Sequence, residues 1–346
     1  MAVDSPIVVA SLRIPYRYKP TDRGIDMHTS DRITLARLPS GVRIETTVHR
    51  YGTGEGPTLY VQAAQHGREI NGTELLRRLH GRLTAEDGPE LRGTLIAVPV
   101  ADPLTFDRVS YTTPEPIDSA APNMNRCWPG DRDGSIHERM AARLWDEIET
   151  ADAVVDCHTG SPEMLTHTVY RRGDEASRRL AEAFGTDLLL AEAAGDDADA
   201  EWDARDFGGK LRVAAGREGI PSITPELGSN KQLDDSAIEA GLSGLMDVCR
   251  HIGLLAGGPE PWDGTRARNH LGRVRAADSG LFVVDDGVEL GMRVEADELF
   301  GTVYEPTTYE PLQEATADRA GIVYSIARES TVTAGQTLVG IAERLD

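Results

Sequence analysis

The sequence predicts an α/β sandwich followed by a smaller, C-terminal all-β domain. Up to about Gly258, short apolar runs alternate with segments whose apolar residues recur at helical spacing, which is typical of α/β proteins. After Gly258, short β-prone runs alternate with glycine turns instead. The 346 residues are enough for two domains. We therefore expect an α/β domain at residues 1–262 and a β-domain at residues 263–346.

The first informative pair of elements is a strand at residues 59–64 and a helix at residues 69–83. The strand run is β-prone and free of proline and glycine, and Gly67 ends it. The helix is predicted by apolar residues at Ile70, Leu75, Leu76, Leu79 and Leu83. His66 then lies at the strand's end and Glu69 in the first helical turn, where both side chains can converge on one metal ion. A helix-capping pair fits the same H-x-x-E spacing.

A second strand, at residues 153–160, carries another histidine near its end, His158. The carboxyl ends of parallel strands meet at one edge of an α/β sheet, so His66, Glu69 and His158 are expected to meet there. Three protein ligands with one open position are the pattern of a catalytic zinc. Zinc lowers the pKa of water toward about 7 and polarises a carbonyl group. The sequence therefore predicts one Zn²⁺ per chain in a hydrolytic site.

A third strand-like run, at residues 220–228, contains Glu226 just before Leu227 and Gly228. A glutamate that faces the attacking water can take its proton and pass it to the leaving nitrogen. Glu226 is therefore the candidate general base. A simple ion pair with an arginine at the strand end remains the alternative.

The fourth motif is a loop at residues 123–130, which proline and glycine flank. Arg126 can bind a substrate carboxylate through both arms of its guanidinium group, and Asn125 beside it can add a hydrogen bond. An ordinary surface arginine would show the same sequence.

Together, these motifs resemble the succinylglutamate desuccinylase/aspartoacylase family of zinc enzymes. The resemblance rests on the segments His66-Gly67-Arg68-Glu69, Asn123-Met124-Asn125-Arg126, Asp156-Cys157-His158-Thr159-Gly160 and Pro225-Glu226-Leu227-Gly228. It spans roughly residues 55 to 346, and four ordered motifs are far more specific than any one of them. It implies a mixed-sheet fold like that of the zinc carboxypeptidases, with the C-terminal β-domain as a barrel-sandwich-like cap.

The resemblance also implies roles for single residues. His66, Glu69 and His158 would bind zinc, Glu226 would activate water, and Asn125 and Arg126 would hold the substrate's carboxylate. The implied activity is zinc-dependent hydrolysis of the linear amide bond of a small N-acyl amino acid.

One departure concerns a second arginine that steadies the oxyanion in many relatives. Here Tyr111 stands where some of them carry it, and Arg108 is a candidate from slightly further upstream.

Three other functions compete with deacylation. A zinc carboxypeptidase acting on peptides would need an open groove, which a capping β-domain narrows. A non-catalytic zinc-binding protein would leave Glu226 without a role. The β-domain also resembles a lipoyl or biotinyl carrier, but the last lysine of the chain is Lys231, so this domain has no lysine to modify.

Composition limits the partners and the compartment. Acidic residues outnumber basic ones by 57 to 36, and the net charge of −21 disfavours binding to nucleic acid or to an anionic membrane. No apolar stretch reaches the roughly 18 residues of a membrane helix, and the first twenty residues lack a secretory pattern. Three distant cysteines favour a reducing compartment. We expect a cytoplasmic enzyme whose partner is its small substrate, with a homo-oligomer left open.

The remaining polar residues receive simpler interpretations. Asp156 should share a face with His158 and contact it, whereas Cys157 should point into the core. The acidic string at residues 192–201 predicts a solvated loop. Surface or core positions without a metal are expected for the other histidines, which are His28, His49, His80, His137, His167, His251 and His270.

Overall fold

The computed structural model describes residues 28–160, 163–193, 200, 202–203 and 207–345. The α/β body contains the strands β1 (His28–Arg37), β2 (Arg43–Gly52), β3 (Thr58–Ala63), β4 (Thr94–Val98), β5 (Ala153–Gly160), β7 (His167–Arg171), β8 (Leu188–Glu192) and β9 (Ser222–Ser229). Its helices are α1 (Asn71–Leu83), α2 (Pro103–Phe106), α3 (Ile136–Ile148), α4 (Glu175–Phe184), α6 (Leu211–Arg217) and α7 (Asp235–His251), with single 3₁₀ turns η1 (Met124–Arg126) and η2 (Phe207–Gly209).

One large mixed sheet runs through the body in the order β1-β2-β4-β3-β5-β9-β7-β8. Strands β4, β3, β5 and β9 are parallel neighbours, whereas β1, β2 and β7 pair in the antiparallel sense with their neighbours β2, β4 and β9. Because β3, β5 and β9 are parallel, their carboxyl ends reach the same edge of the sheet. This is the edge where the sequence places the candidate zinc ligands.

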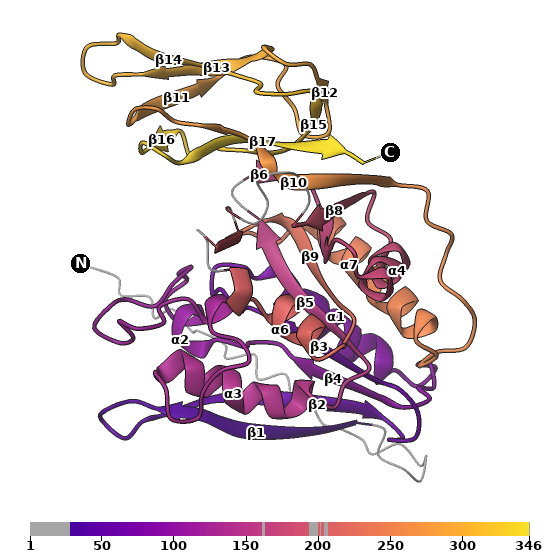
Figure 1. Cartoon of the computed structure of the whole chain (residues 1–346). Helices are drawn as coiled ribbons and strands as arrows, with labels where there is room; N and C mark the ends of the chain where they lie inside the picture. The colour runs from indigo at the N-terminus through magenta and orange to yellow at the C-terminus, as the bar shows by residue number, and fades with distance from the viewer. Residues whose placement is uncertain (1–27, 161–162, 194–199, 201, 204–206, 346) are drawn as a thin grey trace, which may run out of the picture.

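Helices cover both faces of this sheet, as Figure 1 shows. Alternate residues of β3 and β5 point to opposite faces. Leu59 and Val155 pack with α1, α4 and α7 in one core. Tyr60 and Val154 pack with α3 and α6 in the other. The central strands are therefore buried on both faces, which explains why their sequences are apolar almost throughout.

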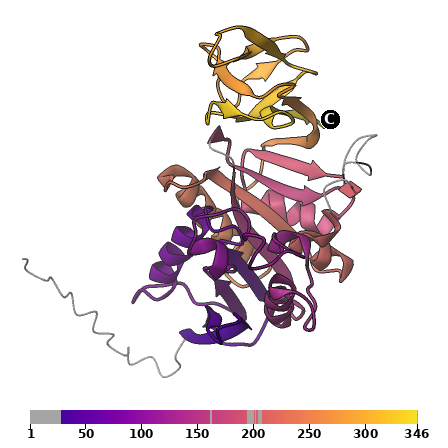
Figure 2. The same ribbon diagram turned by 90° about the vertical axis from the view of Figure 1, so that its left-hand side faces the viewer.

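The C-terminal part of the chain is built from strands alone. These are β10 (Thr265–Arg275), β11 (Gly280–Val284), β12 (Arg293–Val294), β13 (Leu299–Tyr304), β14 (Pro311–Thr316), β15 (Gly321–Ile326), β16 (Thr331–Val332) and β17 (Thr337–Arg344). They enclose their own core around Phe282, Phe300 and Val323. Figures 1 and 2 show this β-domain standing at one end of the α/β body.

Two strands connect the body and the β-domain. β10 pairs with β8 in the parallel sense through residues 265–268 and with β17 in the antiparallel sense from Ala267 onward, so the large sheet continues into the β-domain. The short strand β6 (Glu163–Met164), which follows β5, pairs with β15. A second sheet of the β-domain has the order β14-β13-β11-β16.

The predicted fold class is confirmed: a mixed-sheet α/β sandwich precedes a smaller all-β part. The domain boundary at residues 262 and 263 stays a prediction, since β10 takes part in both units. In the part of the chain that the structure describes, no helix is both long and apolar enough to cross a membrane.

Candidate metal centre

The turn between β3 and α1 presents His66 and Glu69. Ala64 ends the strand with φ of 50°, a left-handed conformation that turns the chain sharply. Gly67 then packs against the backbone of Thr105, where an added Cβ would lie 2.0 Å from the carbonyl. Glu69 was expected in the first turn of the helix, but α1 begins two residues later, at Asn71. Its backbone N–H donates instead to the carbonyl of His66, which holds the two residues in one tight turn.

His66, Glu69 and His158 come together as a buried group. Nδ1 of His66 lies 3.0 Å from one carboxylate oxygen of Glu69, and Nδ1 of His158 lies 2.9 Å from the other. One ligand atom from each residue fits within a 4.8 Å span. None of the three side chains exceeds 6% exposure. The group can therefore hold one metal ion through two Nδ1 atoms and a carboxylate oxygen, which is a ligand set suited to zinc.

The far nitrogens of both imidazole rings contact acceptors that fix their orientation. Nε2 of His66 lies 3.1 Å from Oδ1 of Asn123. Nε2 of His158 lies 2.9 Å from Oδ2 of Asp156, which is the contact expected from strand alternation. Such outer contacts set the tautomer so that Nδ1 keeps its lone pair for a metal.

Asp156 is itself fixed by two buried amides. Gln62 donates to one of its oxygens at 2.9 Å and Gln65 to the other at 3.1 Å. Cys157 lies on the opposite face of β5, in the core beneath α1, as the alternation predicts.

The local charges favour cation binding. Burial opposes ionisation of Glu69, but His66 and His158 outweigh it and hold the pKa of Glu69 well below its usual range. Burial likewise opposes a charge on His158, yet Asp156 and Glu69 raise its pKa well above 6.5. A proton on His158 therefore competes with a metal cation for this position.

Glu226 lies beside this group on β9, where it is the register partner of His158. Burial raises the pKa of its carboxyl group to about 7. A carboxyl group with this pKa can exchange a proton near neutral pH.

Asn125 and Arg126 reach the same cavity from η1. The Asn125 side chain accepts a hydrogen bond from the backbone of Leu211 at 3.2 Å, and its Nδ2 lies 3.5 Å from Nε2 of His158. The guanidinium of Arg126 donates to the Asn125 carbonyl at 2.6 Å and lies over the ring of Phe207. Both side chains line the cavity.

Arg108 is not brought to this cavity. It follows α2, and its guanidinium donates to the Leu104 carbonyl at 3.3 Å. Tyr111 lines the cavity instead, with its ring centre 4.0 Å from that of His66. The geometry therefore gives no support to an oxyanion role for Arg108.

The cavity has a volume of about 290 Å³ and is closed partly by the β-domain. The β-domain contributes Arg273, Tyr324, Ser325 and Thr337 to its wall. Tyr324 meets His167 of β7 edge to face, with 5.5 Å between the ring centres. The cap implied by the family resemblance thus forms part of the cavity wall.

A buried ion group that sequence reasoning missed also lines the cavity. Glu192, at the end of β8, accepts a hydrogen bond from Lys210 Nζ at 2.6 Å and another from Arg212. Although burial opposes its charge, these two cations hold the pKa of Glu192 below its usual range. The expectation of a solvated loop is wrong for Glu192, and residues 194–199 and 201 of that string lie outside the described residues.

Comparisons with known proteins agree with this fold. The model of the succinylglutamate desuccinylase/aspartoacylase catalytic domain matches residues 55–252. The chain is 28% identical over 307 residues to an N-alpha-acetyl-L-2,4-diaminobutyric acid deacetylase from Halomonas elongata, a match that covers 84% of this chain and 83% of the relative.

Solved structures show the same fold. A succinylglutamate desuccinylase/aspartoacylase from Rhodobacter sphaeroides superposes with a TM-score of 0.76 at 25% identity, over 95% of this chain and 99% of that one. A product-bound structure of the ectoine utilization protein EutE (DoeB) from Ruegeria pomeroyi superposes with a TM-score of 0.78 at 24% identity, and the match covers 94% of this chain and 97% of that one. With the catalytic-domain match spanning more than half of its length, the chain belongs to the succinylglutamate desuccinylase/aspartoacylase family.

Proposed function

We propose that this chain is a zinc-dependent amidohydrolase that removes a short acyl group from an N-acyl amino acid. The observation that carries the proposal is the buried group of His66, Glu69 and His158 next to Glu226 in one cavity. Its family membership supports hydrolysis of an amide bond.

The residues present fit a zinc ion. Two oriented imidazoles and one carboxylate supply three ligands and leave a position for water or substrate. When bound, zinc supplies Lewis acidity toward a carbonyl oxygen and lowers the pKa of water. Glu226 would take a proton from the attacking water and return it to the nitrogen that leaves as an amine.

Two arginines are placed to bind the carboxylate of an amino acid substrate. Arg126 lines the cavity beside Asn125. Arg212 also lines it, and among the described residues its buried Nη1 atom has no hydrogen-bond partner. A buried donor without a partner is costly unless a ligand completes it. We therefore assign a carboxylate or carbonyl oxygen of the substrate to this position.

The first substrates to test are N-acetylated diamino acids. The name of the Halomonas elongata relative describes a deacetylase that acts on N-alpha-acetyl-L-2,4-diaminobutyric acid. The cavity of about 290 Å³ is at the small end of the range for ligand pockets, which favours a small amino acid with a short acyl group. N-succinylated and acidic N-acetyl amino acids remain the next candidates.

The test is amine release from N-acetyl, N-succinyl and N-formyl amino acids, alongside short peptides, before and after chelation and zinc return. Release that stops on chelation, returns with zinc and is confined to small N-acyl amino acids supports the proposal. Release of C-terminal residues from peptides would replace it with the carboxypeptidase alternative. Zinc binding without turnover of any substrate would favour a binding protein.

A further inference from the structure

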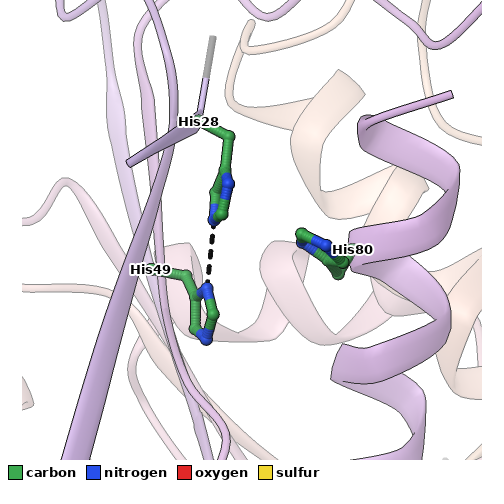
Figure 3. Close-up of side chains that lie close together, drawn as sticks. All are labelled: His28, His49 and His80. Atoms are coloured by element: carbon green, nitrogen blue, oxygen red, sulfur yellow. Dashed lines mark hydrogen bonds between the residues drawn. The ribbon is translucent and has the colours of Figure 1, made fainter. Parts of the chain in front are cut away.

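A second group of histidines lies away from the catalytic cavity, between the edge of the sheet and the end of α1. His28 begins β1, His49 is on β2 and His80 is in the last turn of α1. One ring nitrogen from each lies within 4.8 Å of the others. Figure 3 shows His80 extending from the helix toward the His28 and His49 pair on the strands.

Strand register explains why these side chains meet. His28 pairs with Tyr51 in the antiparallel β1–β2 ladder, and His49 is two residues before Tyr51. The side chains of His28, His49 and Tyr51 therefore point to the same face of the sheet. Tyr51 contacts α1 through its hydroxyl group, which lies 3.0 Å from Nδ1 of His80. The fold thus joins three chain segments at one point.

The distance between the first two histidines is close to that between two ligands of one metal ion. Nε2 of His28 lies 3.0 Å from Nδ1 of His49. Two nitrogens bound to one tetrahedral zinc at about 2.05 Å are about 3.3 Å apart, so a small outward shift would admit an ion. With a metal on Nε2 of His80, its Nδ1–H would donate to Tyr51, which is the usual outer contact of a ligating histidine.

We propose that His28, His49 and His80 form a second metal site that binds a divalent first-row transition ion. Imidazole nitrogens suit zinc, copper and nickel, whereas magnesium and calcium need oxygen ligands, and this group contains no carboxylate. Three protein ligands leave a fourth position for water. Zinc is the probe of choice because its coordination number and distances fit the group.

The two metal sites lie at opposite ends of α1. The catalytic residues His66 and Glu69 precede Asn71, and His80 is nine residues further on, about 14 Å along the helix axis. The second site would not take part in chemistry. It would fasten the edge strand β1 and its neighbour β2 to α1, the helix that follows the catalytic turn, and its binding energy would add to folding stability.

Stacking between aromatic rings is the competing explanation for this group. The rings of His28 and Tyr51 stack with 4.7 Å between their centres. Packing alone predicts no metal uptake, so metal stoichiometry separates the two explanations.

The experiment measures zinc bound per chain after apo protein is dialysed against buffered free zinc. The wild type should bind two equivalents, and His49→Gln or His80→Gln should each bind one. The double variant His66→Gln/Glu69→Gln should keep one equivalent, held by the second group. His251→Gln, on an exposed residue of α7, should bind two, as the wild type does.

Thermal unfolding of the His66→Gln/Glu69→Gln variant supplies a second measurement. Zinc should raise its melting temperature, because an ion that binds only the folded chain stabilises it. The rise should vanish when His80→Gln is added. A wild type that saturates at one equivalent, all of it lost in the His66→Gln/Glu69→Gln variant, would overturn the proposal. So would unchanged zinc binding in both His49→Gln and His80→Gln.

Discussion

At the residue scale, the Glu226 side chain is partly buried, and the loss of solvent around its carboxyl group raises its pKa to about 7. Replacing it by glutamine keeps the shape of the side chain but removes the proton acceptor. We expect kcat for the best N-acyl amino acid to fall by a factor of about 10² to 10⁴, with the zinc content of the catalytic site unchanged.

Steady-state kinetics and metal analysis of the same preparation check this prediction. Glu218→Gln, at an exposed position after α6, is the matched control and should match the wild type. Loss of zinc together with activity would make Glu226 a ligand rather than a base. Unchanged kcat would remove it from the mechanism.

His167 permits a separate test of how burial affects a titrating group. Burial lowers its pKa from 6.5 to about 4, although Nδ1 of the ring contacts the Leu165 carbonyl at 2.8 Å. The unfolded chain takes up this proton near pH 6.5, whereas the folded chain does so only near pH 4. The contribution of His167 to stability is therefore complete above pH 6.5 and is lost as the pH falls toward 4.

This loss amounts to about 3 kcal/mol at most, at 1.36 kcal/mol per pKa unit. His167→Asn retains an N–H donor for the Leu165 carbonyl but cannot titrate. Urea unfolding between pH 4 and 7 should show a shallower decline for the variant than for the wild type. Parallel declines would mean that other groups carry the acid sensitivity.

Some site residues could be predicted from the sequence because each lies at or just after the end of an apolar strand, and such strands are easily recognised. His66 follows β3, and His158 and Glu226 lie near the carboxyl ends of β5 and β9. Glu192 was missed because its partners, Lys210 and Arg212, are 18 and 20 residues away on a different element. His28, His49 and His80 were each interpreted singly, since only the register of β1 and β2 and the packing of α1 bring them together.

At the element scale, the strands and helices that could be predicted were those whose apolar residues form a clear run or recur at a regular spacing. β3, β5, β9 and α1 lie within a few residues of their expected bounds. β14 was missed because only Ala315 of its six residues is fully buried, so no apolar alternation marks it. β7 and β8 were missed as well, although four and five of their residues are buried.

Helix α1 offers a matched pair of glycine substitutions. A Cβ on Gly72 would lie 2.8 Å from the Cβ of Cys157 and 2.9 Å from that of Ala63, whereas one on Gly81 would meet nothing within 4 Å. Alanine at Gly81 should stabilise the protein by about 0.5–1 kcal/mol through helix propensity. Alanine at Gly72 should destabilise it by about 1–3 kcal/mol through overpacking.

Urea unfolding of both variants measures the two effects. Gly72→Ala should also weaken zinc binding at the catalytic site, because it pushes the start of α1, and Glu69 just before it, away from β5. Gly81→Ala should leave zinc affinity unchanged. Equal stability changes in the two variants would show that the contact between α1 and β5 relaxes freely.

At the scale of the whole molecule, the β-domain and the α/β body share a sheet and a cavity. Because β10 pairs with both β8 and β17, the β-domain is held in place by backbone hydrogen bonds as well as by side chains. This connection fixes Tyr324 and Ser325 of β15 in the cavity wall. The size of the accepted substrate is then a property of both units together.

Tyr324 tests this dependence on the β-domain. It is 6% exposed, and its ring packs against His167. Tyr324→Ala removes a large side chain from the wall, so kcat/KM for an N-butyryl amino acid should rise relative to the N-acetyl form by about tenfold or more. Tyr309→Ala, on a residue of the same domain that is 81% exposed, should leave the ratio unchanged. If Tyr324→Ala also leaves the ratio unchanged, the α/β body alone selects the acyl group, and the β-domain closes the cavity without affecting which acyl group is accepted.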